Sequence, residues 1–273
     1  MEAESFDVTL QIEYLEDKSY NRGTIMLAPE RQAYISEFVD EYGNAEVETL
    51  AEKLGVSSMT IRRDLKKLEK EGKLNRCHGG AFVQTEVKYL HKQASNHEIK
   101  KKIAHEASKL VDDGMSVYID AGTTAFEVAL LLGQKNIQIV TNDIMVAANA
   151  SGFKAEVFIC GGHLQKSTES IWGPYATEML KDFRFDISFI GAAAIDKSLN
   201  SLTPTPEKAF MKRLAGSQSQ KSCLVVDASK FDKNSFNLIE NLTGYDIIIT
   251  DYQFSLNQLK LLGSHQTQII HVD

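Results

Sequence analysis

Seven basic side chains lie between Ser57 and Arg76, against three acidic ones. Ile61, Leu65 and Leu68 recur at helical spacing in the same segment, so a helix there would bury one face. The residues left on its solvent side are Thr60, Arg62, Arg63, Lys66 and Lys67. A basic helix face of this kind suits the phosphates and base edges of a DNA major groove. A solvated amphipathic helix is the simpler alternative, and charge by itself favours it.

The elements before this segment help to decide between the two interpretations. Apolar residues at helical spacing predict two short helices, the first from Pro29 to Gly43 and the second from Val47 to Leu54. Gly55 follows the second helix in the terminating role that glycine commonly fills. Ser57 or Ser58 can then cap the basic helix. The predicted order is helix, tight turn and helix.

A hairpin is predicted after the basic helix. Gly72 ends that helix, and the segment from Lys73 to Val83 contains a glycine pair suited to a short turn. Helix, turn, helix and basic hairpin is the order of a winged helix-turn-helix, which favours DNA binding over a merely solvated helix. Arg76 and His78 on the hairpin would contact phosphate or the minor groove. The residues expected to contact DNA are Ser57, Ser58, Thr60, Arg62, Arg63, Lys66, Arg76, His78 and Gly79.

Small and polar residues follow several predicted strands in the second half of the chain. The strand that ends at Asp120 runs into Gly122, Thr123 and Thr124, and then into a helix predicted from Ala125 to Leu132. A glycine and threonine turn that opens a helix offers N–H groups, hydroxyls and a positive dipole to an anion such as phosphate. By itself, such a turn is also a common helix cap. Three further strand ends carry Thr141, Asn142, Gly161, Gly162 and Gly191.

Six short apolar runs alternate with helical segments in this region. They are Ser116 to Asp120, Ile137 to Thr141, Glu156 to Cys160, Ile187 to Gly191, Ser222 to Asp227 and Asp246 to Thr250. Runs of this kind predict buried parallel strands in an α/β sheet with helices on both faces. The carboxyl edge of an open parallel sheet is where ligands bind, so the polar strand ends are expected to form a ligand site.

Two segments carry a family resemblance. Their sequences, SSMTIRRDL from Ser57 and RCHGGA from Arg76, closely resemble the DeoR family of bacterial transcriptional regulators. Further matches lie at Leu202 to Arg213 and Val225 to Phe231, so the resemblance runs from about Leu27 to the C-terminus. It implies a small winged helix-turn-helix domain followed by a mostly parallel α/β sensor domain, similar in fold to ribose-5-phosphate isomerase and CoA transferases. Within the basic helix, we expect Asp64 to hold Arg62 or Arg63 in an ion pair.

The resemblance also implies roles at the ligand site. Asp120 and the turn that follows it would hold the phosphate side of a ligand, Glu207 and Lys212 would line the pocket, and Lys166 stands where relatives often carry a basic residue. The expected effector residues are Asp120, Gly122, Thr123, Thr124, Thr141, Asn142, Gly161, Gly162, Lys166, Gly191, Glu207 and Lys212. The implied function is a sequence-specific repressor of a sugar or carbohydrate operon, whose DNA affinity is controlled by a phosphorylated sugar.

The domain boundaries follow from these assignments. Residues 26–85 form the predicted winged helix-turn-helix, 86–102 a linker with the start of the next helix, and 103–273 the α/β domain for effector sensing and oligomerisation. Residues 1–25 hold six acids against Lys18 and Arg22. We interpret them either as a flexible extension or as a segment upstream of a true start at Met26.

Composition excludes several classes of protein. The formal net charge of -7 argues against a protein that coats nucleic acid non-specifically. No apolar run reaches the roughly 20 residues of a membrane helix, and the acidic N-terminus lacks the features of a signal peptide. We therefore expect a cytoplasmic protein with no membrane partner. The three cysteines form no C-x-x-C pair, and His105 and His163 have no partner at metal-ligand spacing, so no metal is expected. No cofactor is expected either.

Two alternatives stay open at this point. A sugar-phosphate isomerase-like enzyme with a DNA-binding appendage would need an acid and a base, which Asp120, Asp196, Glu207 or Lys212 could supply. A transcriptional activator would carry the same motifs as a repressor, because the sign of regulation depends on where the operator lies. The favoured prediction is a regulator without enzymatic activity. It would act as a homodimer or homotetramer that presents paired helices to double-stranded operator DNA.

Overall fold

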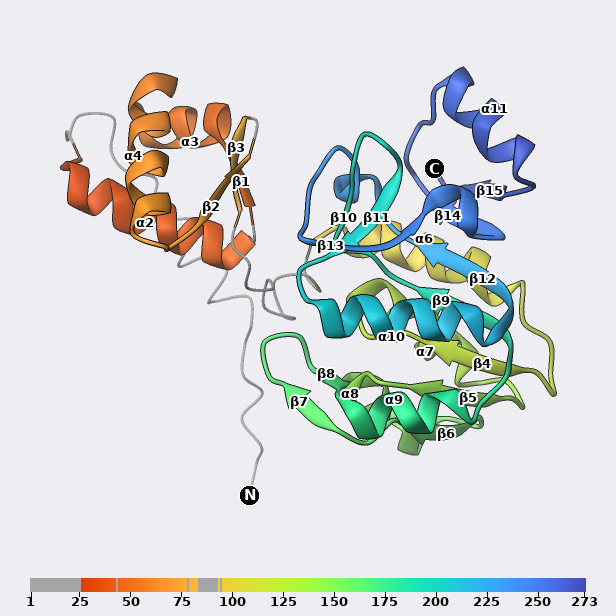
Figure 1. Cartoon of the computed structure of the whole chain (residues 1–273). Coiled ribbons are helices and arrows are strands. Elements are labelled where there is room, and N and C mark those ends of the chain that lie inside the picture. The colour runs from red at the N-terminus through yellow and green to blue at the C-terminus, as the bar shows by residue number, and fades with distance from the viewer. Residues whose placement is uncertain (1–25, 43, 78, 83–92, 94) are drawn as a thin grey trace. The chain divides into compact units, whose positions relative to one another are not determined.

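The computed structural model describes residues 26–42, 44–77, 79–82, 93 and 95–273. The chain divides into two compact units, Met1–Val83 and Gln84–Asp273 (Figure 1). Each unit has a hydrophobic core of its own. The predicted N-terminal extension, His78 and residues 86–92 and 94 of the predicted linker lie outside the described residues.

In its described residues, the N-terminal unit contains the helices α2 (Ala28–Tyr42), α3 (Val47–Leu54) and α4 (Ser58–Lys70). Gly55 ends α3 in the left-handed conformation, with φ 62°, and its N–H is bonded back to the last turn. Ile35 of α2, Leu50 of α3 and Leu65 of α4 are fully buried in one core. The predicted arrangement of helix, tight turn and helix is confirmed.

A small antiparallel sheet completes this unit. β2 (Asn75–Cys77) and β3 (Gly80–Phe82) form the predicted hairpin, and β1 (Asn44–Glu46) pairs with the other side of β3. A Cβ atom at Gly80 would collide with the carbonyl oxygen of Ala45, so only glycine allows this close approach of β1 to β3. The third strand was not predicted, because a three-residue strand carries almost no periodic signal.

A seven-stranded parallel sheet forms the centre of the C-terminal unit. Its strand order is β15-β14-β12-β9-β4-β5-β6. The strands are β4 (Ser116–Ile119), β5 (Gln138–Thr141), β6 (Glu156–Ile159), β9 (Phe185–Ile190), β12 (Ser219–Val225), β14 (Ile247–Thr250) and β15 (Gln268–His271). Six of them were predicted from their apolar runs. The seventh, β15, was missed because it is a short edge strand with two half-buried residues between exposed ends, which leaves no periodic apolar signal.

Helices cover both faces of this sheet, as predicted. Val117 and Ile119 of β4 pack with α6 (His97–Ser108) and α7 (Thr123–Leu132), near α8 (Ile144–Asn149). Tyr118, on the opposite face of β4, packs with α9 (Pro174–Lys181) and α10 (Pro206–Ser217). Leu262 of α11 (Leu256–Ser264) belongs to a third cluster with β12 and β14.

Smaller elements lie around the sheet. One antiparallel sheet has the order β10-β11-β13, from β10 (Ala194–Ile195), β11 (Asn200–Thr203) and β13 (Asn237–Asn241). β7 (His163–Gln165) and β8 (Ser170–Trp172) form a separate hairpin. Short 3-10 turns are η1 (Ala150–Gly152), η2 (Ala228–Lys230) and η3 (Leu242–Gly244). No helix in the described part of the chain is long and apolar enough to cross a membrane.

Candidate DNA-binding helix and effector site

Ser57 is the residue that caps α4. Its hydroxyl accepts a hydrogen bond from the Thr60 N–H at 3.2 Å, and the hydroxyls of Ser57 and Thr60 lie 3.0 Å apart. Of the two predicted caps, the structure therefore selects Ser57 over Ser58. Both hydroxyls are already bonded locally, so their first role is to start the helix in a fixed direction.

The outward face of α4 carries Met59, Arg63, Lys66 and Lys70, all of which are exposed. These positions follow the i, i+4, i+7, i+11 spacing of one helix face, opposite buried Ile61. Arg62 lies at the side of this face, with its guanidinium 3.5 Å from the exposed Glu48 carboxylate. The helix therefore presents a row of positive charge to solvent, preceded by one apolar side chain.

The expected ion pair of Asp64 with Arg62 or Arg63 was wrong. Asp64 lies on the inner face of α4 and is buried, with its carboxylate oxygens 2.6 Å from Nε of Arg31 and 2.7 Å from Nε2 of Gln32, both on α2. Position 64 shares a face with Ile61 and Leu65 and cannot reach the outward arginines. Asp64 therefore links α4 to α2 and does not pair with the outward Arg62 or Arg63.

The hairpin after α4 is tied to the end of that helix. The Arg76 N–H donates to the Glu69 carboxylate at 3.1 Å, and the Arg76 guanidinium lies 3.9 Å from the same group. Gly79 has φ 92°, and its carbonyl accepts the Val47 N–H at 2.9 Å. Arg76 and Gly79 are exposed, whereas His78 lies outside the described residues. The wing is thus held against α3 and α4.

Asp120 joins three elements at the carboxyl edge of the parallel sheet. It follows β4 directly and is buried, and its Oδ2 atom accepts the Gly191 N–H at 2.9 Å. The same oxygen forms an ion pair with the Lys212 ammonium on α10. The structure therefore brings together the predicted residues at the ends of β4 and β9 with a predicted residue of α10.

The turn that follows Asp120 is held by Asn142 and Asp143, which come after β5. Asn142 Oδ1 accepts the Tyr118 hydroxyl and the Ala121 N–H, each at 3.0 Å, and its Nδ2 donates to the Ile171 carbonyl at 3.0 Å. The Asp143 carboxylate accepts the Gly122 N–H at 3.0 Å. Asn142 thus positions the turn through most of its hydrogen-bonding capacity.

The first turn of α7 begins at Thr123, two residues earlier than predicted. Gly122 precedes it with φ 153°, which lies at the limit of the region that favours glycine. Thr123 and Thr124 are buried in this turn. Thr141, also buried, accepts the Asp143 N–H at 3.0 Å through its hydroxyl. The turn therefore combines a helix N-terminus with hydroxyl groups at the carboxyl edge of the sheet, where a ligand is expected.

Asp143 has an unusual electrostatic environment. Burial raises the pKa of its carboxyl group to about 6, and the Asp120 charge acts in the same direction. Hydrogen bonds from Gly122, Met145 and Val146 lower the pKa and only partly offset the burial. The same carboxylate caps α8. An acid that titrates near neutral pH therefore lies beside the candidate anion-binding turn.

Lys208 and Lys212 place two buried ammonium groups one helical turn apart on α10. Lys212 pairs with Asp120, and Lys208 Nζ donates to the Thr168 hydroxyl at 2.6 Å. The Thr168 hydroxyl lies 2.9 Å from that of Ser170, whose backbone forms a bridge with Asp143. A continuous set of contacts thus joins both lysines to the strand ends.

The remaining predicted effector residues are more peripheral. Glu207 and Lys166 are exposed, whereas Asp120 and Lys212 are buried. Gly161 and Gly162 are also exposed. A Cβ atom at Gly162 would lie 2.5 Å from the Trp172 carbonyl oxygen, so this glycine allows the close approach of β7 and β8.

Two family models match the chain: the DeoR-like helix-turn-helix domain over residues 31–87 and the DeoR C terminal sensor domain over residues 95–252. The chain belongs to the DeoR family.

Relatives of similar length support this membership. The HTH-type transcriptional regulator GlpR of Haloferax volcanii is 37% identical over 231 residues, which cover 83% of this chain and 91% of that protein. The glycerol-3-phosphate regulon repressor of Escherichia coli K12 is 30% identical over 250 residues, covering 89% and 99% of the two chains. The expected membership of the DeoR family is therefore confirmed.

Solved structures show a more distant likeness. Ribose 5-phosphate isomerase A of Methanocaldococcus jannaschii is 21% identical, with a TM-score of 0.38 over 50% of this chain and 55% of that one. The strand order of the sensor domain itself confirms the mostly parallel α/β sheet that was predicted. The likeness to CoA transferases stays a prediction.

Sequence reasoning missed Lys208 and Asp143 as site residues of this DeoR-family chain. A signal for Lys208 was present, because it lies four residues before Lys212 and shares its helix face. Asp143 follows Asn142 at a strand end, but its burial depends on the β7 and β8 hairpin, which lies far along the chain. Tertiary contacts of that kind leave no local pattern.

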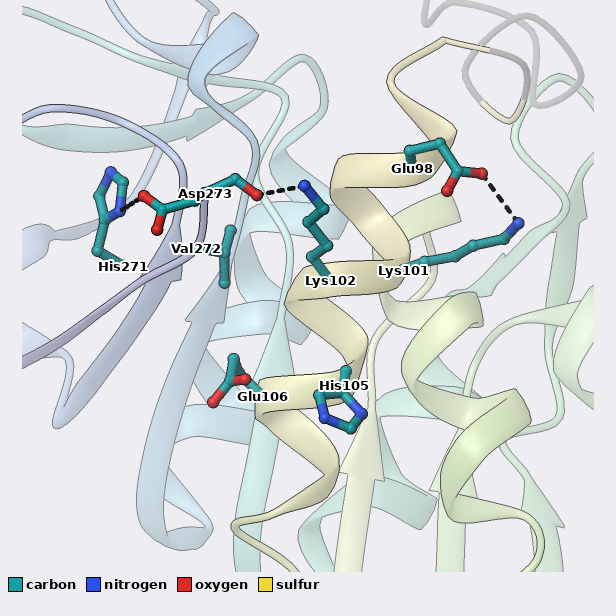
Figure 2. Close-up of a pocket in the computed structure, with 8 residues that line it drawn as sticks. All are labelled: Glu98, Lys101, Lys102, His105, Glu106, His271, Val272 and Asp273. Carbon is teal, nitrogen blue, oxygen red and sulfur yellow. Dashed lines mark hydrogen bonds and ion pairs between the residues drawn. The ribbon is translucent and has the colours of Figure 1, made fainter.

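A separate hollow lies on the outside of α6 (Figure 2). It is lined by Glu98, Lys101, Lys102, His105, Glu106, His271, Val272 and Asp273. None of the predicted effector residues lines it, and its last three residues lie beyond the segment that matches the sensor domain. Lys101 pairs with Glu98 at 3.1 Å in an exposed contact of small energetic value. Across the described residues, no group of three or more His, Cys, Asp or Glu side chains could hold a metal ion.

Proposed function

We propose that this DeoR-family chain represses an operon of carbohydrate metabolism and that a phosphorylated sugar controls its affinity for operator DNA. The observation that carries the proposal is the pair of buried lysines, Lys208 and Lys212, joined by contacts to the first turn of α7. Two ammonium groups and a helix N-terminus make a favourable environment for a phosphate dianion. One relative is named as a repressor of a glycerol-3-phosphate regulon, which supports repression of genes for a phosphorylated metabolite.

The DNA-binding half of the proposal assigns α4 to the major groove. Arg63, Lys66 and Lys70 form one exposed row that can contact phosphates or guanine edges. Residues 26–85 would act as the DNA-binding domain and 103–273 as the effector domain. Arg76 on the wing would add a phosphate contact, with Ser57 and Thr60 fixing the start of the helix. His78 keeps its predicted role as a wing contact.

The effector half of the proposal assigns the phosphate to the Gly122 to Thr124 turn. Lys212 would be shared between Asp120 and the ligand, and Lys208 between Thr168 and the ligand. Both lysines already lie in hydrogen-bonded positions, so little side-chain ordering is needed on binding. A ligand changes DNA affinity only if it binds one arrangement of the protein better than another. The sugar phosphate must therefore favour the arrangement that fits the operator less well.

We further propose that the chain acts as a homodimer or homotetramer joined through the sensor domain, in the cytoplasm, where a bacterial operator lies. Paired recognition helices would then contact two half-sites about one DNA turn apart. Sedimentation velocity at the concentration of the DNA-binding assay tests the oligomer. A chain that remains monomeric in the presence and absence of operator DNA would contradict it.

A regulator without turnover is favoured over the isomerase-like enzyme. Proton transfer at carbon needs a base that can accept the proton, whereas Asp120 and Lys212, two of the candidates, are paired with each other and Asp120 also accepts the Gly191 N–H. Glu207, another candidate for the acid or base, is exposed on α10, whereas Asp120 and Lys212 are buried. Incubation of the protein with pentose and hexose phosphates, followed by NMR of the products, tests this point. Catalytic conversion of a sugar phosphate would favour the enzyme over a regulator without turnover.

The experiment that tests the DNA-binding function begins with selection of duplexes from a random-sequence library by the full-length chain. Fluorescence anisotropy on the selected duplex should then give tight binding that weakens steeply with salt, because several phosphates are neutralised. Arg63→Ala should weaken binding at least tenfold, whereas Lys260→Ala, which removes an exposed lysine of α11, should leave it unchanged. Equal affinity of the two variants for the duplex would show that α4 does not bind in the DNA major groove. A reporter gene under the selected operator distinguishes repression from activation.

A further inference from the structure

Met59 is an exposed apolar side chain on an otherwise basic helix face. It is 67% exposed, although large apolar side chains in the rest of the DNA-binding unit are mostly buried or partly covered. It shares its face with Arg63, Lys66 and Lys70, and it lies in the first turn of α4. The side chain contributes little to the core, so core packing does not explain an apolar residue at this position.

The position of Met59 in the helix limits what it can contact. In recognition helices the N-terminal residues face base edges, while basic residues further along contact phosphates or guanine. Ser57 and Thr60, its neighbours in the first turn, are bonded to one another through their hydroxyls. Met59 is therefore an exposed apolar side chain at the N-terminal end of α4 that would face the bases.

The chemistry of the side chain then selects the base. A thioether and its methylenes offer van der Waals contact and almost no hydrogen bonding. In the major groove, the one large apolar group on a base edge is the C5-methyl of thymine, and apolar side chains recognise it there. The positive charges of Arg63, Lys66 and Lys70 would hold the helix against the DNA backbone and fix the depth of this contact.

We propose that Met59 reads the C5-methyl group of a thymine in each operator half-site. This inference rests on the proposed function and assigns a sequence preference to the same helix. A methyl contact that is removed from water contributes about a three- to tenfold difference in affinity.

The test uses the full-length chain and the duplex selected from the random library. Each thymine is replaced in turn by deoxyuracil, which keeps the base pair and removes only the methyl group. One position per half-site should weaken binding by the wild-type chain about three- to tenfold. Met59→Ala should bind the parent duplex more weakly and lose the discrimination at that position alone. Leu256→Ala, which removes an exposed apolar residue of α11, should retain it.

The outcomes separate the inference from the function on which it rests. If the parent duplex binds tightly, but wild type and Met59→Ala respond alike to deoxyuracil at every thymine, the inference is overturned and the regulator stands. If neither chain binds any selected duplex, the DNA-binding function fails and the inference fails with it.

Discussion

Lys212 and Asp120 form an ion pair that is buried between α10 and the end of β4. The same carboxylate oxygen accepts the Gly191 N–H at 2.9 Å, so one side chain connects two strand ends and a helix. A charge in such a site is stable only while its partner is present. The pair is therefore both part of the candidate effector site and a requirement for the fold around it.

Replacing Lys212 by Met should destabilise the sensor domain by about 3–5 kcal/mol, because Asp120 would be left buried without a counter-ion. The double variant Lys212→Met with Asp120→Asn should recover part of this loss. Urea unfolding followed by the fluorescence of Trp172, the single tryptophan of the sequence, measures both. A single variant as stable as the wild type would show that the pair contributes nothing.

Asp64 provides a second test, in the DNA-binding domain. Asp64→Ala removes the carboxylate that accepts hydrogen bonds from Arg31 and Gln32 and should cost about 3 kcal/mol, because buried Arg31 loses its counter-ion. Glu71→Ala is the matched control, since Glu71 is exposed and pairs with Lys73 at 3.0 Å. It should change stability by less than about 0.5 kcal/mol. Thermal unfolding of the helix-turn-helix by circular dichroism compares the two, and equal melting temperatures would count against a structural role for Asp64.

The cap of α4 can be separated from any contact of Ser57 with DNA. Ser57→Ala should cost about 1 kcal/mol of stability, whereas Ser57→Gly should cost only a few tenths. If Ser57 acts only through the cap, the glycine variant should keep nearly full operator affinity well below its melting temperature. A large loss of affinity in both variants, with little loss of stability, would assign a direct DNA contact to the hydroxyl.

Asp143 makes the stability of the sensor domain dependent on pH. Its pKa is about 6 in the folded chain against 3.8 for the ordinary group, so the folded state binds the proton more tightly. The stabilisation by this group is therefore full below about pH 4, declines as the pH rises and is lost above about pH 6. The linked free energy is about 3 kcal/mol.

The measurement is the difference in unfolding free energy between wild type and Asp143→Asn from pH 4 to pH 7. The variant does not titrate at this position, although it also loses part of the cap of α8. The advantage of the wild type should shrink as the pH rises through this window. A constant difference, or one that grows with pH, would contradict the assigned environment of Asp143.

Local patterns were sufficient for much of the fold. The bounds of α3, its glycine stop and six strands of the sheet follow from apolar periodicity and from glycine, because each of those signals lies within a few residues. The strand β1 and the hairpin of β7 and β8 are short and exposed in part, and their pairing depends on distant segments. Their periodic signal was too weak for prediction.

Some residues of the candidate site were likewise predicted from the sequence, and others were not. Asp120 and Gly122 were predicted because parallel strands end at one edge, where the structure places them. Asp64 was assigned to the wrong partner because ion pairs along one helix are visible in a sequence, whereas the contact with Arg31 spans two helices. Lys208 was overlooked although its spacing from Lys212 placed both on one face of α10.

The most direct test of the account is a fluorescence anisotropy titration of the full-length chain on its selected operator, with a panel of sugar phosphates and the matching unphosphorylated sugars. We predict that one sugar phosphate weakens DNA binding at least fivefold, that its unphosphorylated sugar does not, and that Lys208→Met reduces the response while keeping operator affinity. If tight operator binding is unaffected by every phosphate in the panel, a phosphorylated sugar is not the effector of this protein.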